Sequence, residues 1–230
     1  MDSKNFSVLS KLRTPFRYSY NRVVLVLICI CCVSFALFRF RLFPINESSL
    51  ALSVAGLWSR AFWQPVTYLF MHGSTSHLFF NMLALLFFGL PVEKAIGSKE
   101  FAFLYFVTGI LSGIFSALVY YVLGLHQILS GGYPQAWLYQ LVGASGAIYG
   151  ILLTYAVVFP RAKIFIYALI PVPAPLLVIL YAAIEFFSQF LGSSNVAHCT
   201  HLAGFGFAFL YIFLRMGVNP IRVWKNAYGR

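Results

Sequence analysis

A serine set between glycines is the first place in this sequence where chemistry could be carried out. Ser145 lies in the run Gly143–Gly150, where a polar loop gives way to an apolar segment. A hydroxyl at the start of a helix lies among free backbone N–H groups at the positive end of the helix dipole, which stabilise the negative charge that develops in acyl transfer. Runs rich in Gly, Ala and Ser also occur where transmembrane helices pack closely, so the run alone leaves both interpretations open.

The composition places the chain in a membrane. Of its 230 residues 61% are hydrophobic and only 9% are charged, and the apolar residues form blocks of membrane-spanning length. A formal charge of +11 would suit nucleic acid if the basic residues formed a stripe. They lie instead in short segments between the apolar blocks, so they indicate topology and not a nucleic-acid partner. The four cysteines have neither metal nor disulfide spacing, and we interpret them as packing residues.

The apolar blocks predict an all-α integral membrane protein with six transmembrane helices. The predicted spans are Val23–Phe38, Ser76–Lys94, Glu100–Gly124, Ser145–Phe159, Lys163–Phe187 and Cys199–Arg215. All but three of the 16 Lys and Arg residues then lie on the side of the two termini, which predicts that both termini are cytoplasmic. The predicted division is a cytoplasmic N-tail over 1–22, a six-helix domain over 23–216 and a cytoplasmic C-tail over 217–230.

The first apolar segment could also be a signal peptide. Arg39-Phe40-Arg41 follows it in place of a small-residue cleavage site, so we interpret it as an uncleaved span. The outer segment from Arg39 to His72 contains aromatic residues of the kinds that settle at membrane interfaces: Trp58, Phe62, Trp63 and Tyr68. We expect short helices half-embedded in the outer leaflet there, with an ordinary folded loop as the alternative. We assign no role to the loop from Leu125 to Val142 on the basis of its sequence.

Polar residues in three of the spans share one depth. Polar groups inside a membrane are costly, so each is a functional hypothesis. Each lies 13 to 17 residues from the Lys or Arg that ends its span on the cytoplasmic side, which is roughly 20 to 25 Å along a helix. These residues are His77, Asn81, Ser145 and His201. Because the hydrocarbon core is about 30 Å thick, water could reach this level only through a cavity open to the outside.

Small residues predict that two of these helices meet. Gly146 and Gly150 form a small face on span four, and Gly204 with Ala208 forms one on span six, which would let the backbones approach closely. Contact between these faces would bring the Ser145 hydroxyl toward the His201 imidazole. A serine within hydrogen-bond reach of a histidine is a nucleophile with its general base.

The remaining polar residues have supporting or open roles. His77 and Asn81, four residues apart on one helix face, would form an oxyanion hole with the Ser145 backbone N–H. Glu185, near the outer end of span five, could orient an imidazole, but a position near a helix end also allows solvation. We therefore predict a Ser-His dyad. His72, which precedes a turn-forming stretch, is expected to be structural, with direct substrate contact as the alternative.

A metal site is the remaining alternative for the histidines. His72, His77, His198 and His201 could cluster, but the chain has no HExxH helix and we expect no carboxylate at the right depth. We predict no metal and no cofactor.

Four motifs together resemble one known family. They are an HxxxxHxxxN pattern from His72 to Asn81, the turn Glu93–Ser98, the GxSG sequence Gly143-Ala144-Ser145-Gly146, and a histidine motif from Ala197 to Gly204. In this order and on these spans, they resemble the rhomboid intramembrane serine proteases over nearly the whole chain.

The resemblance implies a site and a substrate class. It makes Ser145 the nucleophile, His201 the general base, and His77 and Asn81 the oxyanion donors. It also implies cleavage of single-pass membrane proteins in or near their transmembrane segment, with lateral access at span five. Prolines are expected to break the middle third of that span: Pro171, Pro173 and Pro175.

Two departures from the family pattern are visible. Gln64 follows Trp63 where the family usually has an arginine, which puts the anchoring of the outer segment in doubt. Ala208 replaces the second glycine of the span-six pattern.

The predicted function is an intramembrane serine endopeptidase whose partners are transmembrane substrates and the lipid bilayer. The alternative is an inactive rhomboid-like protein that binds transmembrane segments for quality control or trafficking. Such relatives typically lack the serine or the histidine, and both are present here. A transporter or channel is disfavoured, because we find neither paired charges across spans nor two matching interrupted helices. The short tails and the lack of a targeting extension lead us to expect a bacterial cytoplasmic membrane, with an internal eukaryotic membrane as the alternative.

Overall fold

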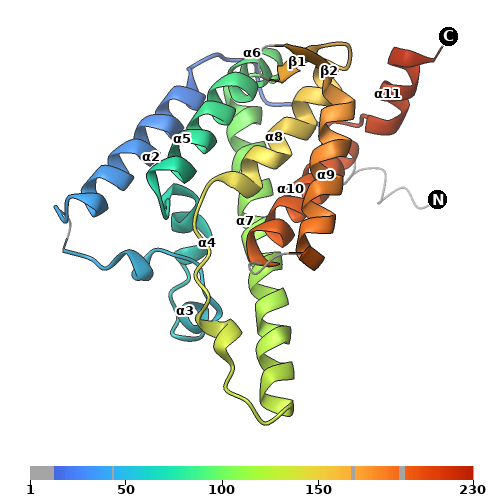
Figure 1. The fold of residues 1–230 in the computed structure, drawn as a ribbon. Coiled ribbons are helices and arrows are strands. Elements are labelled where there is room, and N and C mark those ends of the chain that lie inside the picture. The colour runs from blue at the N-terminus through green and yellow to red at the C-terminus, as the bar shows by residue number, and fades with distance from the viewer. Residues whose placement is uncertain (1–12, 43, 167–168, 192–194, 230) are drawn as a thin grey trace, which may run out of the picture.

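The chain forms a bundle of apolar helices (Figure 1). The structure, a computed structural model, describes residues 13–42, 44–166, 169–191 and 195–229. The body consists of α2 (Val23–Arg39), α5 (Thr75–Ala84) with its continuation α6 (Leu90–Ile96), α7 (Ser98–Leu129), α8 (Ser145–Val158), α9 (Ala174–Leu191) and α10 (Asn195–Leu214). A π-helical turn, η3 (Leu85–Gly89), joins α5 to α6.

The continuous helix Thr75–Ile96 and α7 are long and apolar enough to cross a membrane, and four shorter apolar helices accompany them among the described residues. Five of the six predicted spans coincide with helices to within five residues at each end.

Helix α8 packs against both α7 and α10, and small residues allow both approaches. A side chain at Gly204 of α10 would lie 2.2 Å from the carbonyl oxygen of Gly146, so only glycine permits this contact. A side chain at Gly150 would instead meet the Thr108 hydroxyl of α7 at 3.0 Å. The predicted contact between spans four and six is therefore present at Gly146 and Gly204, and Ala208 is fully buried. The expectation that Gly150 belongs to the same contact is wrong, because it faces α7.

The face of α7 toward α8 is polar. The hydroxyls of Thr108, Ser112 and Ser116 donate to carbonyl oxygens one turn earlier in their own helix, at 2.7, 2.6 and 3.0 Å. Each of these small polar groups is thus satisfied within α7, and Ser116 also shares a hydrogen bond with the Thr200 hydroxyl of α10 at 2.7 Å.

The start of the predicted fifth span is wrong. Residues from Lys163 form an antiparallel hairpin of β1 (Lys163–Ile166) and β2 (Ile170–Pro173), and the helix begins only at Ala174. Pro171 and Pro173 lie in β2, and Pro175 lies in the first turn of α9, where a missing N–H costs little. The prolines therefore start the helix and do not interrupt it.

The outer segment contains the expected short helices. They are η1 (Glu47–Ser49), α3 (Val54–Trp58), α4 (Gln64–Thr67) and η2 (Tyr68–Phe70). Trp58, Phe62 and Trp63 are exposed. Tyr68 is not an interfacial residue as expected, because it is buried and its hydroxyl donates to the Gly109 carbonyl of α7 at 2.5 Å.

Gln64 anchors this outer segment in place of the family's arginine. Its side chain is buried, its Oε1 accepts from the Ser53 backbone N–H at 3.1 Å, and its Nε2 donates to the Ser49 carbonyl at 3.4 Å. A side chain at Gly56 would lie 2.1 Å from Gln64, so glycine makes room for it. Gln64 thus holds the outer segment through contacts with the backbone of Ser49 and Ser53.

The loop after α7 packs back onto the outer segment. Helix α7 runs to Leu129, and the loop then forms η4 (Gln135–Leu138) and pairs Leu141 with Leu52. Trp137 of the loop stacks on Trp58 and Tyr121 at centroid distances of 5.8 Å in each case. This stack gives the loop a structural role that the sequence did not predict.

Both predicted tails lie against one end of the bundle. The part of the N-tail over 1–12 is outside the described residues, but the Asn21 backbone N–H donates to Ser98 Oγ at 2.7 Å. Glu93 is fully buried and accepts from the backbone N–H groups of Val23 and Val24 at the start of α2, at 2.7 and 3.0 Å. These contacts hold the first helix against the α6–α7 turn.

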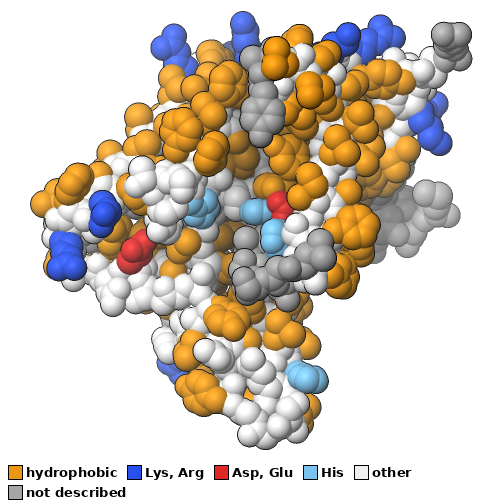
Figure 2. All heavy atoms as spheres, in the orientation of Figure 1, with side chains coloured by type: hydrophobic (Ala, Val, Ile, Leu, Met, Phe, Trp, Pro, Cys, Tyr) orange, Lys and Arg blue, Asp and Glu red, His pale blue; other side chains and the backbone are white. Residues whose placement is uncertain are grey.

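The C-tail forms α11 (Pro220–Tyr228), whose Trp224 indole donates to the Ala156 carbonyl at 2.9 Å. Figure 2 shows Lys and Arg side chains along the same rim of the molecule, above a largely hydrophobic body.

Candidate active site

Ser145 is the first residue of α8, as the sequence predicts. The chain reaches it through Gly143, whose φ of +116° is a conformation that side-chain-bearing residues rarely adopt. A Cβ at Gly143 would also lie 2.8 Å from the His77 ring and 3.5 Å from Asn81 Nδ2. Glycine is thus required both for the turn and for the close approach of α5 to the serine.

His201 lies within hydrogen-bond distance of the serine. Its Nε2 is 2.9 Å from Ser145 Oγ. The ring of Tyr149, one turn after the serine on α8, stacks on the imidazole with a centroid distance of 4.2 Å and an interplanar angle of 6°. The imidazole plane is therefore fixed by a ring from the helix that carries the serine.

Glu185 completes a chain of three groups. Its Oε1 lies 2.9 Å from Nδ1 of His201, its Oε2 lies 2.5 Å from Nδ1 of His198, and the Tyr149 hydroxyl donates to the same carboxylate. The side chain of Glu185 is buried. The expectation that Glu185 is solvated and that the histidine has no acidic partner is wrong. The available signal was that Glu185 is the one acidic residue at the outer end of a predicted span, the end where the candidate serine and histidine lie.

The same three side chains could hold a metal ion. The ligand atoms of Glu185, His198 and His201 lie within 4.8 Å of one another. The sequence argument that no carboxylate lies at the right depth is therefore wrong. In the structure these atoms hydrogen-bond one another, which accounts for their clustering without an ion. That the protein needs no metal and no cofactor stays a prediction.

His77 and Asn81 of α5 face the serine across a cavity of about 730 Å³. Asn81 is buried, and its Nδ2 has no hydrogen-bond partner within the described part of the chain. An unpaired buried donor is costly, so it is suited to a negative oxygen that is present only during a reaction. The rest of the cavity wall is mainly apolar and aromatic and comes from α5, η3, α8, α9 and β1. In Figure 2 histidine side chains and one acidic side chain gather in a hollow between hydrophobic surfaces.

His72 stands behind His77 and lines a different cavity. It is 2% exposed, and its ring meets the His77 ring edge to face at a centroid distance of 5.1 Å. Burial, and next the charge of His77, lower the pKa of His72 to about 4. His72 is thus neutral near pH 7 and supports His77 by packing.

These features define a class of protein. A bundle of apolar helices carries a serine, a histidine and a carboxylate in contact, at the wall of an apolar cavity. Comparison with known proteins gives the family: the Rhomboid domain matches residues 59–217. The chain belongs to the rhomboid family and is an integral membrane protein.

Individual relatives include proteins described as proteases and one described as inactive. The chain is 30% identical over 147 residues to RHOMBOID-like protein 12, mitochondrial, of Arabidopsis thaliana, which covers 60% of this chain and 42% of that protein. It is 29% identical over 151 residues to Rhomboid protease AarA of Providencia stuartii, a match that covers 64% of this chain and 53% of that protein. It is 33% identical over 82 residues to Inactive RHOMBOID-like protein 8 of Arabidopsis thaliana, a match that covers 36% of this chain and 22% of that protein. The chain thus spans about half or less of these relatives.

Proposed function

We propose that this protein is an intramembrane serine endopeptidase that cleaves single-pass membrane proteins in or near their transmembrane segment. The observation that carries the proposal is the 2.9 Å contact between Ser145 Oγ and His201 Nε2 at the wall of the cavity. A nucleophile within reach of its base, with the base oriented by a third group, is the arrangement that acyl transfer needs.

The first half of the reaction acylates the serine. With Nδ1–H donating to Glu185, His201 Nε2 is free to accept the Ser145 proton as Oγ attacks the scissile carbonyl carbon. The carbonyl π bond opens, and its oxygen takes the negative charge next to the Ser145 N–H, His77 and Asn81. The carboxylate of Glu185 stabilises the imidazolium. The C–N bond then breaks, and His201 gives its proton to the leaving amine.

The second half releases the other fragment. His201 takes a proton from a water molecule, and the hydroxide adds to the acyl carbon. The bond to Ser145 Oγ breaks, and the serine regains its proton from His201. The polar end of the cavity, at His77 and Asn81, is where water would be admitted.

The cavity wall suits a transmembrane segment as the substrate. Phe80 of α5, Phe87 of η3 and Tyr181 of α9 line it, and each is also exposed. Figure 1 shows α8 lying between α5 and α9, so the substrate would approach the serine between these two helices. A cavity wall of exposed apolar and aromatic side chains favours a helix that arrives from the bilayer over a polar, soluble peptide.

The topology follows from the same helices. We assign one membrane span to each of α2, the helix Thr75–Ile96, α7, α8, α9 and α10, with both termini cytoplasmic, and we place the outer segment partly in the outer leaflet. The exposed Trp58, Phe62 and Trp63 support this placement. We keep a bacterial cytoplasmic membrane as the proposed location. The oligomeric state is left open.

A second function, binding of transmembrane segments without cleavage, is suggested by the similarity to a relative described as inactive. The present chain retains Ser145 and His201 in hydrogen-bond contact, which favours the protease.

Cleavage in proteoliposomes tests the choice between the two functions. The substrate is a single-pass protein with a helix-weakening Gly/Ala stretch near its outer end, and the variants are Ser145→Ala and His201→Ala. Ser130→Ala, at an exposed serine outside the cavity, is the control. Cleavage by the wild type and the control but not by the two variants supports the protease. Substrate that co-purifies with the wild type but is never cut favours the binding function.

A further inference from the structure

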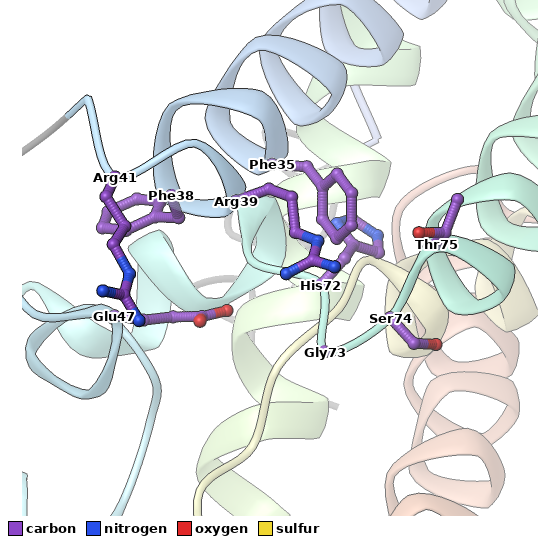
Figure 3. Close-up of a pocket in the computed structure, with 9 residues that line it drawn as sticks. All are labelled: Phe35, Phe38, Arg39, Arg41, Glu47, His72, Gly73, Ser74 and Thr75. Atoms are coloured by element: carbon purple, nitrogen blue, oxygen red, sulfur yellow. The ribbon is translucent and has the colours of Figure 1, made fainter.

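A second cavity, of about 410 Å³, lies between the end of α2 and the start of α5 (Figure 3). None of the residues that line it also lines the catalytic cavity. Two features make it a candidate binding site: it is rich in basic and polar groups, and it contains a buried side chain without a partner.

The basic groups are Arg39 and Arg41, in the turn that ends α2. Both are exposed, and neither has a carboxylate within 4.0 Å among the residues that the structure describes. Figure 3 shows the Arg39 guanidinium near the His72 ring, and the Arg41 guanidinium at the other side of the cavity beside Glu47. The two arginines and Glu47 leave this cavity with an excess of positive charge.

The buried group without a partner is His72. Its side chain lines the cavity, it is 2% exposed, and neither ring nitrogen makes a hydrogen bond of normal geometry within the described residues, where a weaker contact with the Phe70 backbone favours the charged form of the ring. A neutral imidazole has one N–H donor, and leaving such a donor unpaired in a buried position costs free energy. An acceptor inside the cavity would remove that cost.

The start of α5 adds a third attraction for an anion. Ser74 caps this ten-residue helix by accepting from the His77 backbone N–H at 3.1 Å, and Thr75 is its first residue. Both line the cavity. The N-terminal end of a helix carries partial positive charge and hydrogen-bond donors. The start of α5 therefore places partial positive charge at the wall of the cavity that the two arginines also line.

We propose that this cavity binds the phosphate group of a phospholipid headgroup. Arg39 and Arg41 supply charge and donors, with guanidinium geometry suited to two phosphate oxygens. His72 and the start of α5 supply further donors. Glu47 accepts from a hydroxyl or ammonium group of the headgroup, so a headgroup that carries such a donor is preferred.

The position of the cavity and its apolar wall distinguish a lipid from a free anion. Phe35 and Phe38 line the side formed by α2, and they would contact the glycerol and the upper acyl chain. In the proposed topology the arginines stand where α2 leaves the bilayer on the outer side, which is the level of the headgroups. This placement rests on the proposed topology, but lipid binding does not depend on proteolysis.

Bound phosphate would also steady the catalytic wall. His72 would donate to it from one edge, and the same ring packs against His77, which lines the catalytic cavity. The lipid would thus fix one of the proposed oxyanion donors through a single intervening side chain.

Native mass spectrometry of the full-length protein tests the site. The protein is released from micelles that contain equal amounts of phosphatidylethanolamine, phosphatidylglycerol and phosphatidylcholine. The variants are the double substitution R39Q/R41Q, the conservative R39K/R41K, and Arg60→Gln. Arg60 is an exposed arginine of the outer segment that does not line the cavity. A melting curve of each variant, measured without phospholipid, shows that the fold is intact.

The proposal predicts one retained phospholipid on the wild type, on Arg60→Gln and on the lysine variant. It predicts at least a tenfold lower retained fraction for R39Q/R41Q at an unchanged melting temperature, and weaker retention of phosphatidylcholine than of the other two lipids. Equal retention by the wild type and R39Q/R41Q would overturn it. A separate arm adds inorganic phosphate: if phosphate stabilises the wild type through Arg39 and Arg41 while no lipid is retained, the lipid assignment is wrong.

Discussion

The two sides of α8 are built in opposite ways. Toward α7 the glycines of α8 lie against the small side chains of Thr108 and Ser112, and toward α10 a single methyl group at Gly204 would collide with the Gly146 carbonyl. Toward α5 and α9 it faces a cavity of about 730 Å³ with exposed aromatic residues at its wall. The closed side holds Ser145 and His201 in one geometry. The open side leaves room for a substrate, so rigidity and access are divided between two faces of one helix.

The first expected effect comes from spreading the closed side. Gly204→Ala would push α10 away from α8 and separate His201 from Ser145, so we expect cleavage to fall by at least about 100-fold, since small displacements of catalytic groups are that costly. Gly206→Ala, two residues along the same helix, is the control, because no heavy atom among the described residues lies within 4 Å of the added methyl group. Equal activity of the two variants in proteoliposomes would contradict the packing argument.

The second effect concerns the group that orients the base. Glu185→Gln keeps the size of the side chain but removes the charge that would stabilise the His201 imidazolium. We expect kcat to fall by about 10²- to 10⁴-fold with little change in KM, as when the acid of a serine–histidine–aspartate triad is neutralised. His198→Gln removes the second histidine contact of the carboxylate, leaves the Tyr149 and His201 contacts in place, and should cost far less. A Glu185→Gln enzyme with wild-type kcat would restore the dyad predicted from the sequence.

The open side should show an effect on binding and not on chemistry. Phe80 lines the cavity and is 66% exposed, whereas its neighbour Phe79 is 58% exposed and does not line it. Phe80→Ala should raise KM about three- to tenfold at constant kcat, because it removes contact that ground state and transition state share. Phe79→Ala should stay within twofold. The idea fails if the two variants behave alike.

The smallest effect is on stability and depends on pH. His72 is almost fully buried, like the residues on the closed side of α8. Its folded-state pKa of about 4 lies below the ordinary value of 6.5. Below pH 6.5 the unfolded chain takes up a proton that the folded chain refuses, so stability is complete above pH 6.5 and is lost as the pH falls toward 4. The loss reaches about 3 kcal/mol.

Melting curves in phospholipid-free detergent at pH 7.5 and pH 5 measure this effect. Between pH 7.5 and pH 5 the melting temperature of the wild type should fall further than that of His72→Gln, because glutamine does not titrate. An identical loss in both would show that His72 is not the group responsible.

Hydrophobic runs and charge placement were enough to locate most helices. The ends of α2 and α8 match the prediction to within one residue, because apolar length and a following Arg or turn define them directly. The fifth span failed because Lys163 to Pro173 is apolar enough to continue a helix, yet alternating prolines favour an extended chain. Composition alone does not distinguish the two.

The sequence predicted those parts of the candidate site that depend only on a residue's position along its own helix. Depth along a helix placed His77, Asn81, Ser145 and His201 at one level, and the structure brings them to one cavity. The role of Glu185 was not predictable in this way, because its partners come from α8 and α10 and their direction depends on how three helices pack. The same holds for Gln64, whose contacts lie in the folded outer segment.

The most direct test of the central claim is covalent labelling of the serine in the folded protein. The wild type in detergent is treated with a fluorophosphonate, which reacts with activated serines, and the adduct is mapped by peptide mass spectrometry. The account predicts one adduct, on Ser145, that is absent from Ser145→Ala, strongly reduced in His201→Ala and retained in Phe79→Ala. No adduct on the intact wild type, or labelling of Ser145 that persists without His201, would contradict the claim that the 2.9 Å contact activates this serine.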